Sequence, residues 1–321
     1  MPAPIIFIHK GLSSYLWCSL WQCHLRNPEA EIVLIGDRDP NLKYVTFEPI
    51  SRHAHAASEF RRAYIHASTN GLEFERFCFE RWFLLNSLVQ QREWKRFVHA
   101  DSDLMFYCTI ESYFERLGDA VLACGRVGAS SGHLMLVQDP AMLSDLCSFM
   151  LKMYLDPDLF MDFFRIYRHH RSTGADGGLC DMSALTAFIE KNFTTHYELN
   201  RVVDGTIFDQ SVTNPYTRDR IELFPIGPEG KAISREDNDL FFRDREGRSV
   251  RALTIHFQGQ SKSLMRRYTE APPLRIRLEY GAAVFQERTK RALDRVNILR
   301  RHYATGIAKR LRRQLFGNRS R

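Results

Sequence analysis

Two carboxylates stand between two apolar runs at Phe97–Phe106, where the sequence reads Phe-Val-His-Ala-Asp-Ser-Asp-Leu-Met-Phe. The first run predicts a buried strand that ends at Asp101. Asp101 and Asp103 would then lie at the carboxyl end of this strand, the edge where α/β sheets collect ligands. Two carboxylates on one side of extended backbone repel each other, and a divalent cation relieves that repulsion. Oxygen ligands favour Mg²⁺ or Mn²⁺, ions that commonly bridge to substrate phosphates. The alternative is an Asp-Ser-Asp turn that only caps the strand.

The segments before this motif predict that the sheet begins with parallel strands. A strand, a helix and a second strand follow one another within a short stretch, which is a βαβ unit. They are Ile5–Ile8, Ser13–Leu25 and Glu31–Gly36. A nucleotide on such a unit lies over the carboxyl ends of the strands. We therefore expect Lys10, Gly11 and Asp37 to meet it, with ordinary loop residues as the alternative.

A long amphipathic helix is predicted over Leu72–Gln90, directly before the Asp-Ser-Asp strand. Its apolar face comprises Phe74, Phe77, Cys78, Leu84, Leu85, Leu88 and Val89. Arg81 falls in the middle of this face, where a buried guanidinium needs an acceptor. Arg81 therefore either pairs with a buried carboxylate or reaches a phosphate of a ligand.

A second motif follows the strand predicted at Ala252–Phe257. His256, Gly259 and Lys262 recur there at intervals of three residues. They bring together an imidazole that can bind a metal, a backbone that a ligand can approach closely, and a cation suited to a phosphate. His256 would complete a mixed oxygen and nitrogen site with the two aspartates.

At these two motifs the chain resembles the GT-A glycosyltransferases, whose Asp-x-Asp motif follows a nucleotide-binding βαβ region. More narrowly, His256-x-x-Gly259-x-x-Lys262 is similar to the signature of the retaining family 8 enzymes, such as glycogenin and bacterial lipopolysaccharide galactosyl- and glucosyltransferases. The resemblance covers roughly residues 4–265 in element order. Ser263-Leu264 stands where a Pro-Trp pair often follows the signature, so the chain is a divergent relative.

The resemblance implies an α/β fold of the GT-A type, with a Rossmann-like, mixed but mostly parallel sheet flanked by helices. It implies that Asp101, Asp103 and His256 bind Mn²⁺ or Mg²⁺, with Asp101 also near the ribose. Gly259 and Lys262 would contact the diphosphate of the donor.

Further residues receive roles only through this resemblance. Arg81 resembles a basic residue that contacts the diphosphate or the sugar. Ser131 and Gly132 resemble a turn before a strand that shapes the pocket for the donor sugar. Asp181, which as a helix N-cap already has a structural explanation, stands where the family has a carboxylate beside the anomeric carbon. Cys180 precedes it in place of the usual Gln.

The function implied is the metal-dependent transfer of a hexose from a UDP-sugar to a saccharide or a lipid-linked saccharide, with retention at the anomeric carbon. An inverting transferase would need a carboxylate base, for which Asp181 and Asp209 are the candidates. A nucleotidyltransferase on a similar sheet would share the metal requirement. A non-catalytic scaffold that docks on membranes would not depend on the aspartates at all.

The net charge of +7 is unevenly spread. Residues 286–321 hold 12 of the 45 Lys and Arg but 2 of the 38 Asp and Glu, so the other 285 residues carry 33 basic and 36 acidic side chains. We expect a catalytic domain over residues 1–271 and a basic amphipathic helical tail over 274–321. Such a tail suits an anionic membrane surface, with a solvated helix packed on the body as the alternative. No nucleic-acid partner is expected, because the body lacks a basic face with interleaved aromatic residues.

Composition also bears on the compartment. The chain has seven cysteines without a Cys-x-x-Cys pair, which indicates reduced thiols and no zinc site. It has no apolar run long enough to span a bilayer, and its start reads as a core strand instead of a signal peptide. We therefore expect a cytoplasmic protein, with peripheral attachment to the inner face of the cell membrane through the tail.

Overall fold

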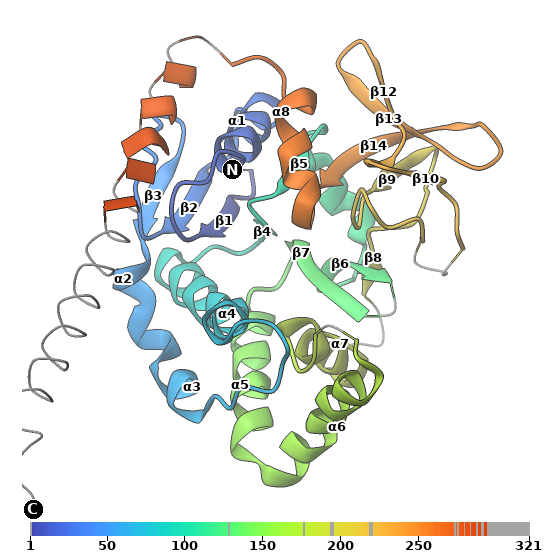
Figure 1. Ribbon diagram of the computed structural model, residues 1–321. Helices are drawn as coiled ribbons and strands as arrows, with labels where there is room; N and C mark the ends of the chain where they lie inside the picture. Colours follow the sequence, from blue (N-terminus) through green and yellow to red (C-terminus); the bar gives the residue numbers. More distant parts are fainter. Residues whose placement is uncertain are drawn as a thin grey trace, which may run out of the picture.

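The computed structural model describes residues 2–293, except 128, 176, 193–195, 218–220, 273, 275, 279, 283, 287, 290 and 291. Two larger sheets, a short two-stranded sheet and the helices around them make up the described part of the chain (Figure 1). The α/β class and the mostly parallel, helix-flanked central sheet that the sequence predicts are confirmed.

The central sheet has the strand order β3-β2-β1-β4-β7-β6-β8. Its strands are β1 (Ile5–His9), β2 (Ile32–Gly36), β3 (Thr46–Pro49), β4 (Phe97–Ala100), β6 (Leu122–Val127), β7 (Ala129–Val137) and β8 (Tyr197–Glu198). Strands β3, β2, β1 and β4 run parallel to one another, and β7 is antiparallel to both of its neighbours. The carboxyl ends of β1, β2 and β4 therefore meet at one edge, as the βαβ pattern predicts.

Burial on both faces explains the continuous apolar run of β1. Ile6 and Ile8 belong to one core and Ile5 and Phe7 to the other, because alternate side chains of a strand point to opposite faces. Helices α4, α5 and α7 pack on the Ile6 side, and α1 packs on the Ile5 side (Figure 1). The helices are α1 (Leu16–Arg26), α2 (Ile50–His53), α3 (Ser58–Ala63), α4 (Leu72–Arg92), α5 (Ala141–Leu155), α6 (Pro157–Thr173), α7 (Asp181–Asn192) and α8 (Met265–Tyr268).

A smaller sheet stands beside the central one, with the order β12-β13-β14-β5 and with β9 paired to β14. Its strands are β5 (Leu104–Phe106), β9 (Thr206–Phe208), β12 (Ile233–Glu236), β13 (Asp239–Arg243) and β14 (Ser249–His256), and a separate pair is formed by β10 (Ile226–Gly227) and β11 (Gly230–Lys231). The chain crosses from the central sheet to the smaller one within the turn that joins β4 to β5. That turn is the Asp-Ser-Asp motif, so the motif lies where the two sheets meet.

Three local predictions are wrong. The first helix begins at Leu16, later than predicted, because residues 13–15 form a turn. Phe74 is 65% exposed instead of lying on the buried face of α4. Ser131 and Gly132 lie inside β7 and not in a turn before it, since the strand continues from Ala129. A run of small residues looks like a turn in sequence but pairs here with β6.

The first part of the predicted tail packs on the body. Tyr280 is buried, its hydroxyl donates a hydrogen bond to the carbonyl of Ser13, and its ring centroid lies 6.1 Å from that of Trp17. Residues 294–321 of the predicted basic tail lie outside the described residues. Within the part of the chain that the structure describes, no helix is both long and apolar enough to cross a membrane.

Candidate active site

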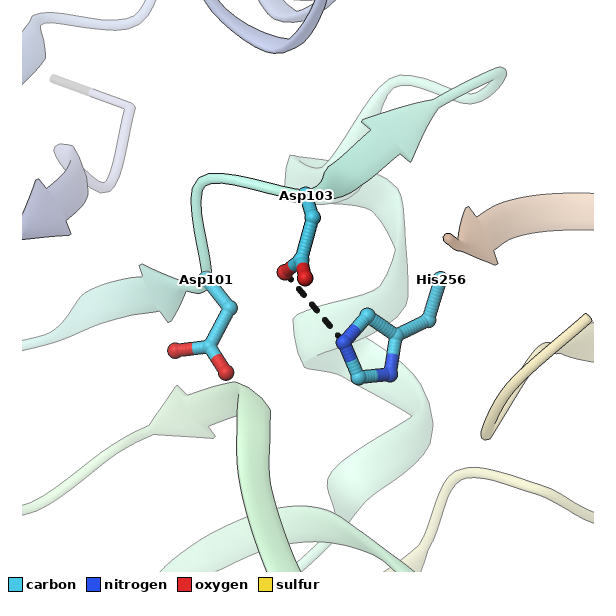
Figure 2. Close-up of side chains that lie close together, drawn as sticks. All are labelled: Asp101, Asp103 and His256. Carbon is cyan, nitrogen blue, oxygen red and sulfur yellow. Dashed lines mark ion pairs between the residues drawn. The ribbon is translucent and has the colours of Figure 1, made fainter. Parts of the chain in front are cut away.

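Asp101, Asp103 and His256 converge where the two sheets meet (Figure 2). Asp101 and Asp103 come from the turn between β4 and β5, and His256 is the last residue of β14. The pairing of His256 with Leu104 across β14 and β5 brings the imidazole beside the turn. One ligand atom from each of the three residues lies within 4.8 Å of the others. These are the residues that the sequence predicts to hold a divalent cation.

Asp103 stands between two cationic groups. Its carboxylate lies 3.3 Å from Nε2 of His256 and 3.1 Å from Nζ of Lys262. Burial disfavours the charged form of Asp103, but the hydrogen bond and charge of His256 outweigh it and lower its pKa. Burial likewise disfavours the charged His256, yet Asp103 and Asp101 raise its pKa to about 8. The site is thus a concentrated set of charges at the edge of the sheet.

Arg81 joins two carboxylates of the site. Its guanidinium donates to Oδ1 of Asp101 at 2.5 Å and to Oδ2 of Asp181 at 2.7 Å. Burial disfavours the charged form of Asp101, but Arg81 and then His99 outweigh it and hold the pKa of Asp101 far below its usual range. The sequence leaves open whether Arg81 pairs with a carboxylate or reaches a ligand. The structure shows pairing with the buried Asp181 and the partly buried Asp101.

The indole of Trp82 donates to the same carboxylate oxygen of Asp181 as Arg81 does. Its Nε1 donates to Oδ2 of Asp181 at 3.1 Å, and its ring packs edge-on against His99 with a centroid distance of 5.2 Å. Gly132 on β7 leaves room for this indole, since a Cβ there would lie 2.4 Å from the ring. Gly132 therefore has a packing reason to be glycine.

We expect Gly132→Ala to displace Trp82 and to loosen Asp181, because the added methyl would overlap the indole. Overpacking of this kind costs about 1–3 kcal/mol of the free energy of unfolding. Quenching of tryptophan fluorescence by iodide would report whether Trp82 becomes exposed. Gly71→Ala is the control, because a Cβ at Gly71 meets nothing within 4 Å. Equal stability and equal quenching in both variants would contradict the packing argument.

Of the three residues predicted to meet a nucleotide after β1 and β2, Gly11 and Asp37 pair with each other and Lys10 does not. The backbone N–H of Gly11 donates to Oδ1 of Asp37 at 2.6 Å, and Gly11 has a φ of +82°, which favours glycine. The ammonium of Lys10 lies 3.9 Å from the ring centroid of Phe77 on α4. Lys10, Gly11 and Asp37 do not belong to the cluster that Asp101, Asp103 and His256 form at the sheet edge.

The other predicted residues lie around the three ligands. Gly259 and Lys262 are on the 3₁₀ turn Gly259–Leu264 that follows β14. Gly259 has a φ of +63° and open space around the position of a Cβ, so its backbone is accessible. The hydroxyl of Ser131 hydrogen-bonds Nδ1 of His133 at 2.9 Å, and the ring of His133 stacks on His256 with centroids 4.5 Å apart.

The donor set fits a divalent cation of the Mg²⁺ or Mn²⁺ type. Two carboxylates and one imidazole are hard or borderline ligands, and they converge from two different strands. A cation held by Asp101, Asp103 and His256 would supply positive charge that stabilises a leaving phosphate. Lys262 lies next to the carboxylate of Asp103 and could contact that phosphate as a second cation.

Three solved structures with some similarity to this chain are described as glycosyltransferases. Mouse xyloside xylosyltransferase 1 aligns with a TM-score of 0.45 and 13% identity, over 64% of this chain and 88% of that chain. The glycosyltransferase GlyE of Streptococcus pneumoniae TIGR4 gives 0.41 and 13%, over 90% and 64%. The bifunctional glycosyltransferase WbbM gives 0.47 and 10%, over 87% of this chain and 51% of that one. No protein-family model and no curated protein matches the chain.

Proposed function

We propose that this protein is a metal-dependent glycosyltransferase of the GT-A type. It transfers a hexose from a UDP-sugar to a saccharide or a lipid-linked saccharide, with retention at the anomeric carbon. The observation that carries the proposal is the convergence of Asp101, Asp103 and His256 at the carboxyl edge of β4, with Lys262 beside Asp103. This set offers a cation site and a phosphate-binding cation at the sheet edge where nucleotides bind.

Lys262 and Arg81 have distinct tasks in this proposal. Breaking the bond between a sugar and a phosphate places negative charge on the departing UDP. Lys262 is half-buried and lies beside the cluster, so it can exchange its contact with Asp103 for one with the diphosphate. Arg81 holds Asp101 and Asp181 in place through its two hydrogen bonds. Positioned charges of this kind act where charge develops and need little reorganisation.

The state of the two candidate bases favours retention over inversion. An inverting reaction needs a carboxylate that is free to accept a proton from the acceptor. Asp181 is hydrogen-bonded by Arg81 and by Trp82. Asp209 is fully buried and forms an ion pair with Lys231. In the retaining reaction the acceptor attacks the face that UDP leaves, and a phosphate oxygen can take the proton.

The test is a calorimetric titration of UDP into the full chain with and without Mn²⁺, followed by incubation with a panel of UDP-sugars. We expect UDP to bind more tightly with Mn²⁺ and one UDP-sugar to be hydrolysed slowly without an acceptor. NMR of the anomeric proton in the first product formed would report retention or inversion. Absence of UDP binding in both conditions would reject the UDP-sugar donor. Release of pyrophosphate from UTP in the presence of a sugar 1-phosphate would indicate a nucleotidyltransferase.

A further inference from the structure

A buried ion pair lies directly behind His256. Nζ of Lys231 donates to Oδ1 of Asp209, and the two side chains are 2% and 0% exposed. The same ammonium donates to the carbonyl of Ser211 at 3.1 Å. Removing two charges from water costs several kcal/mol per ion, so such a pair is weak evidence for a purely stabilising role. Its contacts indicate what else it does.

Asp209 and the neighbouring Gln210 both contact His256. Oδ2 of Asp209 accepts a hydrogen bond from the backbone N–H of His256 at 3.3 Å. The carbonyl of Gln210 lies 2.8 Å from Nδ1 of the same histidine. Because a carbonyl oxygen can only accept, Nδ1 must carry a proton. In the neutral ring this leaves the lone pair on Nε2, the nitrogen that faces Asp103.

We propose that Lys231 is a positioning residue for the metal site. It holds both ends of the segment 209–211, through the carboxylate of Asp209 and the carbonyl of Ser211. The carbonyl of Gln210 is thereby fixed against the imidazole of His256, which sets the tautomer and the direction of Nε2. The inference rests on the proposed function, because it assigns His256 as a metal ligand.

Backbone hydrogen bonds place Lys231 beside the segment 209–211. The N–H of Lys231 donates to the carbonyl of Val212 at 2.8 Å, and the N–H of Val212 donates to the carbonyl of His256 at 2.9 Å. Gly230 makes the approach possible, since it has a φ of +105° and a Cβ there would lie 2.5 Å from the oxygen of Val212. The ammonium of Lys231 is also enclosed by the rings of Phe224 and Phe242, at 4.9 and 5.0 Å from their centroids.

The test compares the wild type with the double variant Asp209→Asn/Lys231→Met. The double variant leaves no lone buried charge, so it avoids the large destabilisation that Lys231→Met alone would cause. Asn still offers an acceptor to the N–H of His256, but the hold of Lys231 on the segment is lost. The matched control is Asp244→Asn, which removes the ion pair with Arg248 next to the other end of β14, away from His256.

Two measurements are made on each protein. Nitrogen-15 NMR of the histidine rings, followed as the pH is raised until the ring signals of His256 stop shifting, reports the tautomer of its neutral form. Electron paramagnetic resonance of free Mn²⁺ gives the affinity for the metal alone. We expect the wild type and Asp244→Asn to hold the Nδ1–H tautomer. In the double variant we expect a mixture of tautomers and a dissociation constant for Mn²⁺ higher by about 10–100-fold.

A double variant with the wild-type tautomer and an unchanged affinity for Mn²⁺ would overturn the inference. So would an equal loss of affinity in Asp244→Asn, because the effect would then follow from stability alone. Failure of the wild type to bind Mn²⁺ would count against the proposed function. The tautomer measurement needs no metal, so in that case it still decides whether Lys231 positions His256.

Discussion

Asp103→Asn is expected to abolish the dependence of UDP binding on Mn²⁺ and to lower sugar transfer by about 10²–10³-fold. The carboxylate of Asp103 contacts both His256 and Lys262. Its neutral amide would lose the charge that attracts the cation and would leave the imidazole and the ammonium without their shared partner. Calorimetry of UDP with and without Mn²⁺, and initial rates with the UDP-sugar that the wild type uses, measure the two effects.

The control for this variant is Asp145→Asn, which makes the same chemical change at an exposed position on α5. We expect Asp145→Asn to bind UDP with Mn²⁺ and to transfer sugar as the wild type does. If Asp103→Asn kept the tighter binding of UDP with Mn²⁺, the assignment of Asp103 as a metal ligand would be wrong. If it lost only turnover, Asp103 would act on the reacting sugar instead.

Arg81→Met is expected to lower both stability and transfer. The guanidinium holds Asp101 and Asp181 at 2.5 and 2.7 Å, and its loss leaves two largely buried carboxylates without their cation. Breaking a buried pair in this way costs about 3–5 kcal/mol of the free energy of unfolding. Urea unfolding at neutral pH without metal measures this loss, and the rate of sugar transfer should fall because Asp101 no longer points to the cluster.

The pH dependence of stability separates this explanation from loss of packing. In the wild type, the lowered pKa of Asp101 contributes stability above the pKa of the unfolded chain, and this contribution is lost as the pH falls. Without Arg81, the pKa of Asp101 is lowered less, so this pH-dependent contribution becomes smaller. We therefore expect the difference in unfolding free energy between Arg81→Met and the wild type to shrink toward acidic pH. A difference that stays constant would indicate lost packing.

Arg76→Met on the same helix is the control for Arg81→Met. Arg76 pairs with the exposed Glu73 and with Glu80, which keeps Arg61 as a partner. Exposed ion pairs contribute about 0–1 kcal/mol, so we expect little change in the stability of this variant. If Arg76→Met lost as much stability as Arg81→Met, the loss would come from a change in α4 and not from the two carboxylates that Arg81 contacts.

Short motifs in the sequence predict the three clustered residues, because each motif follows an apolar run that forms a buried strand. Asp101 and Asp103 come at the end of β4, and His256 comes at the end of β14. The sequence does not indicate that β5 leaves the central sheet to pair with β14, since strand pairing depends on partners far along the chain. The prediction that the three meet rests on the family resemblance and not on spacing.

The residues that surround these ligands could not be predicted, for the same reason. Trp82, Gln210 and Lys231 act through contacts with distant segments, and nothing near them in sequence marks that role. Gln210 acts through its backbone carbonyl, which is the same in every residue type. Phe74 is an error of the opposite kind, because it is predicted to be buried and is exposed. Helical periodicity predicts which residues share a face, but it does not predict how much of that face the neighbouring elements cover.

The position of the Asp-Ser-Asp turn has a consequence for how the protein is synthesised. Asp101 and Asp103 leave the ribosome long before His256, which lies on the last strand of the smaller sheet. The parallel strands β1, β2 and β4 can assemble on a nascent chain, but the proposed metal site stays incomplete until β14 has emerged and paired with β5. A chain truncated before β14 would lack both His256 and Lys262, so Asp103 would be left without the two cationic groups that it contacts. A cation bound by Asp101, Asp103 and His256, as we propose, would join an early and a late segment of the chain, and it could bind only after β14 has been synthesised.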